Sequence, residues 1–149
     1  MNITIVSRIP AQSAAHVFAG FDENLFRYLS PAYPPLKVHR FDGCRKGDKV
    51  VVALVIFPGV NLKWESEITE CIVEGNHFFS FTDVGRALPF FLRSWHHQHI
   101  IRQQDADVFI EDRIAFSGPW FMPAFLSYPL LWLSFNSRKS KYLRYFAHD

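Results

Sequence analysis

The sequence predicts an α+β fold in which a curved antiparallel sheet of about seven strands packs around a long C-terminal helix. Six consecutive segments in the middle of the chain have the residue pattern of strands, and short turns separate most of them. Residues 120–146 are apolar at first and amphipathic later, which is typical of a helix. Because one face of the sheet must be buried, and this helix is the only element large enough to cover it, we expect the sheet to curve around the helix.

The chain begins with one predicted strand and two predicted short helices. Residues 2–7 alternate isoleucine with polar residues, which predicts the strand. Pro10 suits the first turn of a helix, and we expect this helix to end at Gly20. Asp22 is a favourable N-cap for the second helix, which ends before the proline-rich linker that starts at Pro31.

The six central strands follow the linker. They cover residues 36–41, 49–57, 62–73, 77–84, 94–103 and 108–116. A two-residue turn at Asp105-Ala106 joins the last two, and turns this short make neighbouring strands antiparallel. Only residues 85–93 need a longer loop. The final helix over residues 120–146 is expected to be interrupted near Pro129.

These elements are expected to form one domain over residues 1–149. The net charge of +2 is too small to indicate nucleic-acid binding, which needs a stripe of basic residues on one face. One basic cluster falls in the last turns of the final helix, where positive charge complements the helix dipole. That cluster consists of Arg138, Lys139, Lys141 and Arg144. We therefore expect no nucleic-acid partner.

The cysteines and the apolar segments indicate which cellular compartment to expect and whether the chain inserts into a membrane. Cys44 and Cys71 have the spacing of no metal motif, and no apolar signal-peptide region starts the chain, so we expect a reduced cytoplasmic setting and no cofactor. Residues 121–135 are rich in apolar side chains but contain Pro123 and Pro129, which argues against stable membrane insertion. We expect a monomer or a homodimer.

A sequence motif of aromatic, acidic and histidine residues extends through the middle of the chain. It consists of Phe81 and Asp83, Pro89 and Phe90, Trp95 with His97 and His99, Asp112 with Ile114 and Phe116, and Pro119. Together with the order of elements, this motif resembles the START, polyketide-cyclase and birch-pollen-allergen superfamily (SRPBCC), and within it a bacterial branch. The resemblance covers nearly the whole chain and implies the helix-grip fold, with an apolar ligand between sheet and helix. Some members are cyclases or hydrolases and others only carry or sense lipids, so the fold does not choose the function.

Strand alternation places Trp95, His97 and His99 on one face of the predicted sheet. The turn at Asp105-Ala106 sets the register with the last strand. The pairs on that face are then His99 with Asp112, Ile101 with Ile110, and His97 with Ile114.

The preceding strand presents Phe79, Phe81 and Asp83 on one face. In the register that we expect, Phe81 lies near His97 and Asp83 lies near Trp95. Two histidines and two aspartates then gather inside an aromatic wall, which is the most distinctive feature of the sequence.

Four interpretations of this group stay open. The simplest is that His99 and Asp112 satisfy each other, since a buried carboxylate without a partner is costly. The group can instead orient the polar end of an apolar ligand. It can carry acid and base chemistry, with His97 or His99 as proton carrier and Asp112 setting the tautomer, although the sequence offers no matching nucleophile. A metal site would use the His-x-His pair with Asp83 or Asp112, but without a clear third ligand we expect no metal.

The function that we predict is binding of a mostly apolar small molecule, lipid-like or polycyclic and aromatic, rather than catalysis. The ligand would lie in a cavity of some hundreds of Å³ between the sheet and the final helix. The expected lining residues are Trp64, Phe79, Phe81, Asp83, Trp95, His97, His99, Asp112, Ile114, Phe116 and Trp120. One alternative is an enzyme of the cyclase or hydrolase kind, with His97, His99 and Asp112 as candidate catalytic residues. The other is a protein interaction module without a ligand, which fits if large side chains fill the cavity.

Overall fold

The computed structural model describes residues 1–147, so His148 and Asp149 of the predicted domain lie outside the described part. The elements follow in the order β1 (Asn2–Ile9), α1 (Ala14–Ala19), α2 (Glu23–Leu29), β2 (Leu36–Phe41), β3 (Lys49–Phe57), β4 (Val60–Glu74), β5 (Phe78–Ala87), β6 (Ser94–Gln104), β7 (Asp107–Ser117), α3 (Ala124–Asn136) and α4 (Arg138–Phe146). The order of elements and the α+β fold are as predicted from the sequence.

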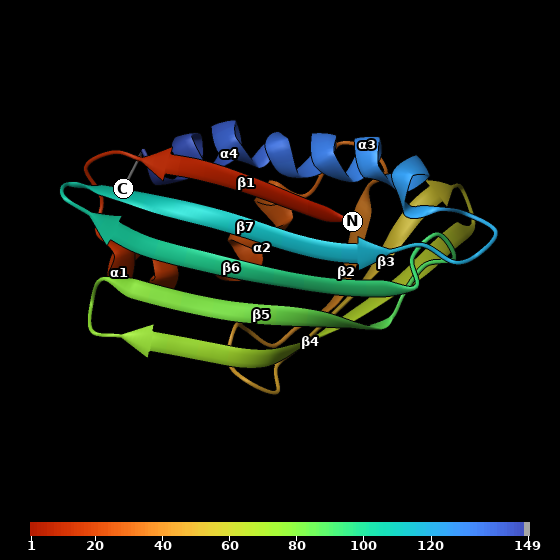
Figure 1. Cartoon of the computed structure of the whole chain (residues 1–149), viewed down its shortest axis with the longest axis horizontal. Coiled ribbons are helices and arrows are strands. Elements are labelled where there is room, and N and C mark those ends of the chain that lie inside the picture. The colour runs from red at the N-terminus through yellow and green to blue at the C-terminus, as the bar shows by residue number, and fades with distance from the viewer. Residues whose placement is uncertain (148–149) are drawn as a thin grey trace.

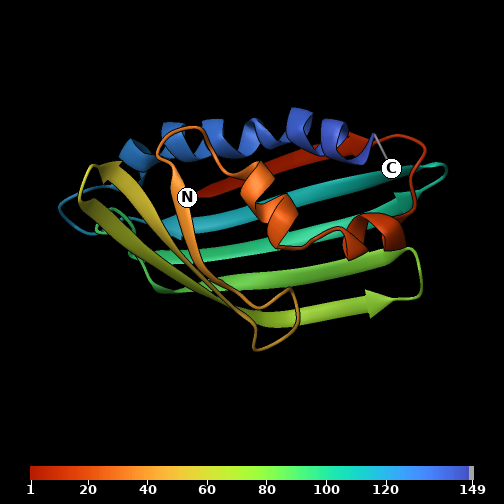
Figure 2. The ribbon, with the colours of Figure 1, turned by 180° about the vertical axis from the view of Figure 1, so that it is seen from behind.

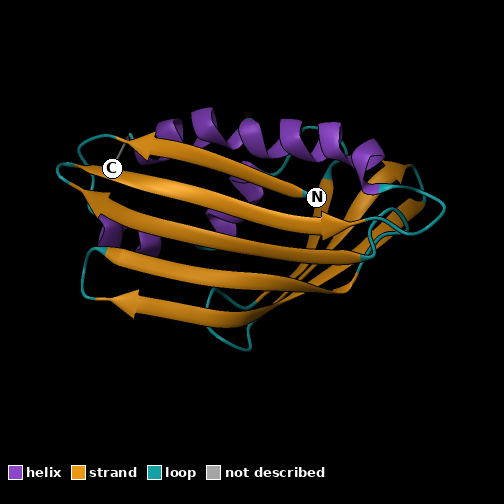
Figure 3. Ribbon diagram, viewed as in Figure 1, coloured by secondary structure: helices purple, strands orange, loops and turns teal. Residues whose placement is uncertain are grey.

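The strands of the described residues form one antiparallel sheet in the order β1-β7-β6-β5-β4-β3-β2 (Figure 1). β1 therefore pairs with the last strand of the chain rather than with its neighbour in sequence. The helices form a second layer on one face of the sheet (Figure 3). The sheet curves so that β2 and β3 turn toward that layer, and α1 and α2 lie on its concave side (Figure 2).

The hairpin of β6 and β7 has the predicted two-residue turn. Asp105 adopts a φ of 55°, the left-handed conformation that such a turn requires. The side-chain amide of Gln103 donates to the carbonyl oxygens of Asp105 and Asp107, each at 3.1 Å, and so holds the turn. All three predicted pairs, His99 with Asp112, Ile101 with Ile110 and His97 with Ile114, are present. The register of the last two strands is therefore confirmed.

The predicted register of β5 against β6 is wrong. Phe81 lies opposite His99 and Asp83 lies opposite His97, whereas the sequence predicts His97 and Trp95 as their partners. The loop between these strands carries no turn motif that would set the register. The shift is by two residues along β6, which keeps side chains on their predicted face, so Phe81 and Asp83 still point inward.

Both short helices are capped by side chains, but the first begins later than predicted. Ser13 caps α1 by accepting a hydrogen bond from the backbone nitrogen of His16 at 3.2 Å. Pro10 lies in the turn before it, because β1 extends further than predicted and the chain must reverse direction before a helix can start. The predicted N-cap of the second helix is confirmed, since Asp22 accepts from the backbone nitrogen of Leu25 at 2.9 Å.

The C-terminal helix is interrupted at Ser137 rather than near Pro129. α3 continues through Pro129, and α4 starts directly after Ser137, so the two helices lie end to end beside β1 (Figure 1). Pro129 cannot donate to the carbonyl of Phe125, but both residues are exposed, so water can replace the lost hydrogen bond. Within residues 1–147, no helix is long and apolar enough to cross a membrane.

Two clusters of buried side chains fill much of the space between sheet and helices. The first, which we call the packed end, consists of Ile9, Ala14, Val17, Leu25, Leu29, Phe79, Ile101, Val108, Ile110, Tyr142 and Phe146. The second consists of Ile3, Ile5, Leu92, Trp95, Ile114, Phe116, Leu131 and Phe135. On β6, His97 and His99 fall between the packed-end residue Ile101 and Trp95 of the second cluster.

Candidate functional site

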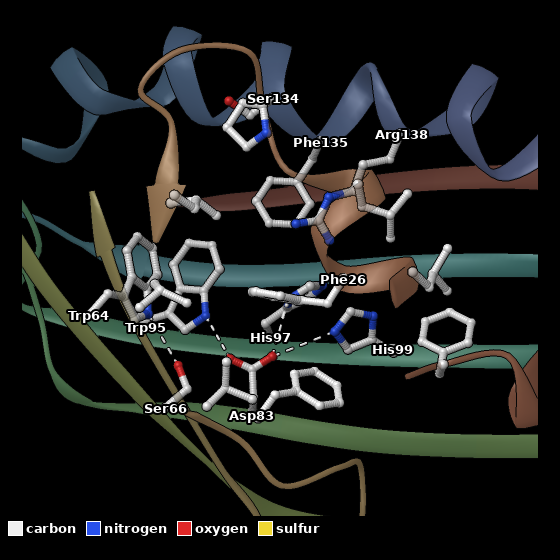
Figure 4. A pocket seen from close by; sticks show the side chains of 18 of the residues that line it. Phe26, Trp64, Ser66, Asp83, Trp95, His97, His99, Ser134, Phe135 and Arg138 are labelled. Atoms are coloured by element: carbon white, nitrogen blue, oxygen red, sulfur yellow. Dashed lines mark hydrogen bonds and ion pairs between the residues drawn. The ribbon is translucent and has the colours of Figure 1, made fainter. Parts of the chain in front are cut away.

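A cavity of about 190 Å³ lies between the concave face of the sheet, α2 and the junction of α3 with α4 (Figure 4). The apolar side chains of its lining include Phe21, Leu25, Phe26, Leu29, Val50, Val52, Leu54, Trp64, Ile68, Phe81, Trp95, Leu130, Leu131 and Phe135. The polar ones are Asp22, Cys44, Ser66, Asp83, His97, His99, Ser134 and Arg138. The cavity is thus a largely apolar space with a few polar groups on its floor, the sheet, and on its roof, the helices.

The residues predicted to line the cavity fall into two groups. The first group lines it and consists of Trp64, Phe81, Asp83, Trp95, His97 and His99. The second group does not and consists of Phe79, Asp112, Ile114, Phe116 and Trp120.

Their positions in the strands explain why most residues of the second group do not line the cavity. Phe79 belongs to the packed end, where it stacks on Phe18 with ring centroids 4.5 Å apart. Three of the residues belong to β7, one strand further from the cavity, namely Asp112, Ile114 and Phe116. Trp120 precedes α3 instead of belonging to it, and its side chain is 92% exposed. The helical wall of the cavity therefore starts at Leu130.

Sequence reasoning missed the wall that lies across from β6. Val50, Val52 and Leu54 of β3 and Phe26 of α2 form part of it. Alternation along β3 marks the three aliphatic residues as one face of a strand. No local pattern shows how strongly a sheet curves, so the sequence did not indicate that this face encloses the cavity.

Sequence reasoning also missed Arg138 as a lining residue, because it falls in the basic cluster. Its guanidinium lies over the ring of Phe135, 4.0 Å from the centroid, and lines the cavity. Among the described residues, no carboxylate lies within ion-pair distance of Arg138. Lys141 of the same basic cluster instead donates to the carbonyl of Ser30 at 2.7 Å and ties α4 to the end of α2.

Asp83, His97, His99 and Asp112 form one connected group, which we call the His/Asp cluster. Nδ1 of His97 lies 3.2 Å from Oδ2 of Asp83, and its Nε2 lies 3.0 Å from Oδ1 of Asp112. Nε2 of His99 lies 3.6 Å from the same oxygen of Asp83, and its Nδ1 lies 3.0 Å from the same oxygen of Asp112. Each imidazole therefore lies between two carboxylates, with Asp83 on the side that lines the cavity (Figure 4).

Asp112 depends mainly on His97 for hydrogen bonding. Its side chain is fully buried, and Nε2 of His97 shares a hydrogen bond with its Oδ1 at 3.0 Å. Nδ1 of His99 is equally close but makes no hydrogen bond, so that contact lacks the required direction. Oδ2 of Asp112 is also buried without a hydrogen-bond partner. The simplest interpretation from the sequence, a self-satisfied pair of His99 and Asp112, therefore has to include His97.

Aromatic side chains hold the cavity side of the cluster in place. The indole nitrogen of Trp95 donates to Oδ1 of Asp83 at 2.9 Å (Figure 4). Phe81 stacks on His99 with ring centroids 4.3 Å apart. Phe135 covers the His97 ring from the helix side, at a centroid distance of 5.1 Å.

Comparisons with known proteins place this geometry in a structural context. No protein-family model and no curated protein sequence matches the chain. Among solved structures, Ms6760 from Mycobacterium smegmatis is 16% identical with a TM-score of 0.67, and the match covers 97% of this chain and 90% of that one. Ara h 8.0201 is 15% identical with a TM-score of 0.65, over 100% of this chain and 99% of that one. Norcoclaurine synthase from Thalictrum flavum is 11% identical with a TM-score of 0.60, over 99% and 87%.

The chain has the helix-grip fold. The resemblance drawn from the motif of aromatic, acidic and histidine residues is therefore confirmed at the level of the fold. Sequence identities this low show a common architecture and not a common activity. In this helix-grip chain, the properties of the cavity have to come from its own residues.

Opposing effects set the protonation of the His/Asp cluster. Burial alone would raise the pKa of Asp83 and of Asp112, but the neighbouring imidazoles of His97 and His99 outweigh it and hold both pKa values well below the usual range. Burial alone would lower the pKa of His97, but its hydrogen bonds to Asp112 and Asp83 outweigh burial and raise that pKa. In the metal-free protein, the electrostatics therefore favour ionised carboxylates around a protonated His97.

Cys44 is the thiol on the cavity wall, and its environment keeps it unreactive. Burial raises the pKa of Cys44 to about 12, so the thiol stays protonated at neutral pH and is a poor nucleophile. Its Sγ donates to the carbonyl of Phe21 at 3.5 Å. The chemistry available in this helix-grip cavity is therefore that of the His/Asp cluster and Arg138. The donor atoms of Asp83, His97 and His99 lie within 4.8 Å of one another, so these residues could also hold a metal ion.

Proposed function

We propose that the protein binds a mostly apolar small molecule in the cavity between the sheet and the C-terminal helices. The observation that carries this proposal is the cavity of about 190 Å³ with mainly aliphatic and aromatic walls. Walls of this kind, with a few placed polar groups, are typical of small-molecule sites. Norcoclaurine synthase, which shares the fold, has been solved in complex with dopamine and hydroxybenzaldehyde.

The volume favours a compact occupant. A protein cavity of about 150 Å³ holds benzene. A space of about 190 Å³ therefore suits a molecule with one or two rings better than an extended lipid chain. Of the two ligand types that the sequence suggests, the proposal favours the aromatic one.

The polar lining indicates where the occupant carries its polar group. Arg138 brings a positive charge to the helical wall, and no carboxylate of the described residues neutralises it at ion-pair distance. Asp83 and His99 offer an acceptor and an imidazole on the opposite wall. An aromatic molecule with a phenol or a carboxylate at one end can accept a hydrogen bond from Arg138 while its ring contacts the apolar walls.

Binding of naphthol, a fluorescent molecule with a polar end and two fused rings, tests this proposal. We expect saturable binding with one site per chain. Val52→Phe replaces one wall side chain by a larger ring that fills part of the cavity, so it should weaken binding by about tenfold or more, which corresponds to about 1.4 kcal/mol. The matched control is Val60→Phe at an exposed position of β4, 47% exposed, which should bind as the wild type does. Equal effects of the two variants, or no saturable binding, would overturn the proposal.

Acid and base catalysis is the second candidate, and one observation favours it. His97 and His99 both line the cavity instead of facing only the protein interior, and general acid and base chemistry needs a group within reach of a substrate. Carboxylates engage both nitrogens of His97, so His99 is the better proton carrier. Mass spectrometry of the molecules that co-purify with wild type and with His99→Gln distinguishes the candidates. A product that is present with wild type and absent with His99→Gln supports catalysis, and identical contents support binding alone.

A further inference from the structure

Three side chains of the His/Asp cluster point donor atoms at one place beside the cavity. His97 and His99 lie two positions apart on the inner face of β6, and Asp83 lies opposite His97 on β5. Oδ2 of Asp83 is 3.2 Å from Nδ1 of His97 and 3.6 Å from Nε2 of His99. Two ligand atoms that bind one ion at about 2.1 Å each lie about 3.0 to 3.6 Å apart at the usual coordination angles. The oxygen of Asp83 therefore lies at such a distance from each of the two nitrogens, and the three ligand atoms all lie within 4.8 Å of one another.

The opposite edges of both imidazoles face a second carboxylate. Nε2 of His97 and Nδ1 of His99 each lie 3.0 Å from Oδ1 of the fully buried Asp112. A histidine that binds a metal usually donates its other ring N–H to a carboxylate or a carbonyl, which sets the tautomer and the direction of the ring. Trp95 supports the third side chain in the same way, by donating to Oδ1 of Asp83 at 2.9 Å. His97 and Asp83 thus each have a hydrogen-bonded orienting partner behind them, and the ring of His99 is held by stacking on Phe81.

The charge of the His/Asp cluster also favours binding of a cation. Histidine binds a metal in its neutral form, so His97 would give up its proton. Two ionised carboxylates beside two neutral imidazoles then carry a net charge of −2, which a single divalent cation would neutralise. Buried charge without compensation is costly. Arg138 lies on the opposite, helical wall of the cavity and contacts the ring of Phe135 rather than a carboxylate.

We propose that Asp83, His97 and His99 bind one divalent transition-metal ion, with Asp112 orienting His97. Two imidazole nitrogens and one carboxylate oxygen suit ions such as Zn²⁺, Co²⁺ or Fe²⁺, whereas Mg²⁺ and Ca²⁺ prefer sites built from oxygen alone. Three protein ligands leave at least one coordination position open, and these ligands line the cavity. The site does not depend on the proposed aromatic occupant, because its ligands and their partners all come from the chain.

The proposal reverses the expectation from the sequence, and the reason lies in the strand register. The expectation of no metal came from the lack of a clear third ligand for the His-x-His pair. In the predicted register Asp83 lies beside Trp95, whereas in the structure it lies directly opposite His97. The carboxylate is therefore in the position that a third ligand needs.

Titration of the chelator-treated full chain with Zn²⁺, followed by calorimetry, tests the site directly. We expect one Zn²⁺ per chain, with stoichiometric binding lost in Asp83→Asn and in His99→Gln, two variants that keep much of the original side-chain shape. Asp112→Asn should weaken affinity by about 10 to 100-fold, the effect of losing a partner behind a metal ligand. His96→Gln is the matched control, since His96 is an exposed histidine on the outer face of the same strand, and it should bind Zn²⁺ as the wild type does.

Co²⁺ provides a second measurement on the wild type that does not depend on how the variants fold. A site with nitrogen and oxygen ligands and few coordination positions should give visible absorption bands stronger than those of hydrated Co²⁺, and equimolar Zn²⁺ should remove them. Circular dichroism establishes that each variant is folded. The proposal is overturned if the wild type binds no Zn²⁺, if folded Asp83→Asn or His99→Gln binds as the wild type does, or if His96→Gln loses binding.

Discussion

β6 passes through two contrasting regions, the packed end and the floor of the cavity. At the packed end its inner face carries Ile101, which is completely buried, and Tyr142 and Phe146 of α4 fill the same cluster. Further along the same face come His99 and then His97, beside empty space. The polar side chains thus lie where the helical layer leaves room, and the large apolar ones lie where the helices pack directly on the sheet.

The contrast indicates that stability and binding come from different parts of one sheet. Substitutions at the packed end remove well-packed apolar surface, so they should lower stability without changing what the cavity binds. Substitutions at the cavity floor should change binding, and they should lower stability only where they leave a carboxylate unpaired.

The largest expected effect is at the packed end. Phe146→Ala should lower the free energy of unfolding by about 3 to 5 kcal/mol, because it removes a fully buried ring that the neighbouring helices cannot replace. The matched control is Leu143→Ala on the same helix, where the side chain is 42% exposed and a much smaller loss is expected. Denaturant unfolding gives both values. A loss in Phe146→Ala no larger than that in Leu143→Ala would remove the distinction between the regions.

A smaller effect is expected inside the His/Asp cluster, measured in the presence of a chelator. Contacting residues show coupling of about 0.5 to 3 kcal/mol in a double-mutant cycle. We expect coupling in this range for His97→Leu with Asp112→Leu, since the pair shares a hydrogen bond of 3.0 Å. The cycle of His99→Leu with Asp112→Leu should give a smaller value, because that contact has no hydrogen-bond geometry. Additive losses in the His97 cycle, or the reverse ranking, would contradict the geometry of the cluster.

The sequence predicted the parts of the fold that local patterns determine. A two-residue turn sets the β6–β7 register, so the facing positions of His99 and Asp112 followed from that turn together with strand alternation. The N-cap at Asp22 followed from the preference of an aspartate for that position.

The parts that were missed depend on distant contacts. The loop between β5 and β6 has no turn motif, so Asp83 was placed opposite the wrong residue and its position directly across from His97 was not predicted. The curvature that brings β3 around the cavity comes from the whole sheet. Arg138 belongs to a basic cluster in sequence, and only the structure shows that its guanidinium lies over the ring of Phe135 and that the residue lines the cavity.

Methyl NMR during a naphthol titration tests the central claim most directly, because it locates binding within the folded protein. The cavity carries the methyl groups of Val52, Leu54 and Ile68. The packed end carries those of Val108 and Ile110. Since naphthol should enter only the cavity, the cavity signals should shift with one common saturation curve while the packed-end signals stay in place.

The same spectra report on another apolar region, the exposed face of α3. Leu126 and Leu133 lie there, 54% and 62% exposed, and an apolar molecule that only sticks to the surface would shift their signals. The account predicts saturable shifts at Val52, Leu54 and Ile68 with little change at Leu126 and Leu133. Shifts confined to α3, or shifts spread equally over the cavity and the packed end, would contradict it.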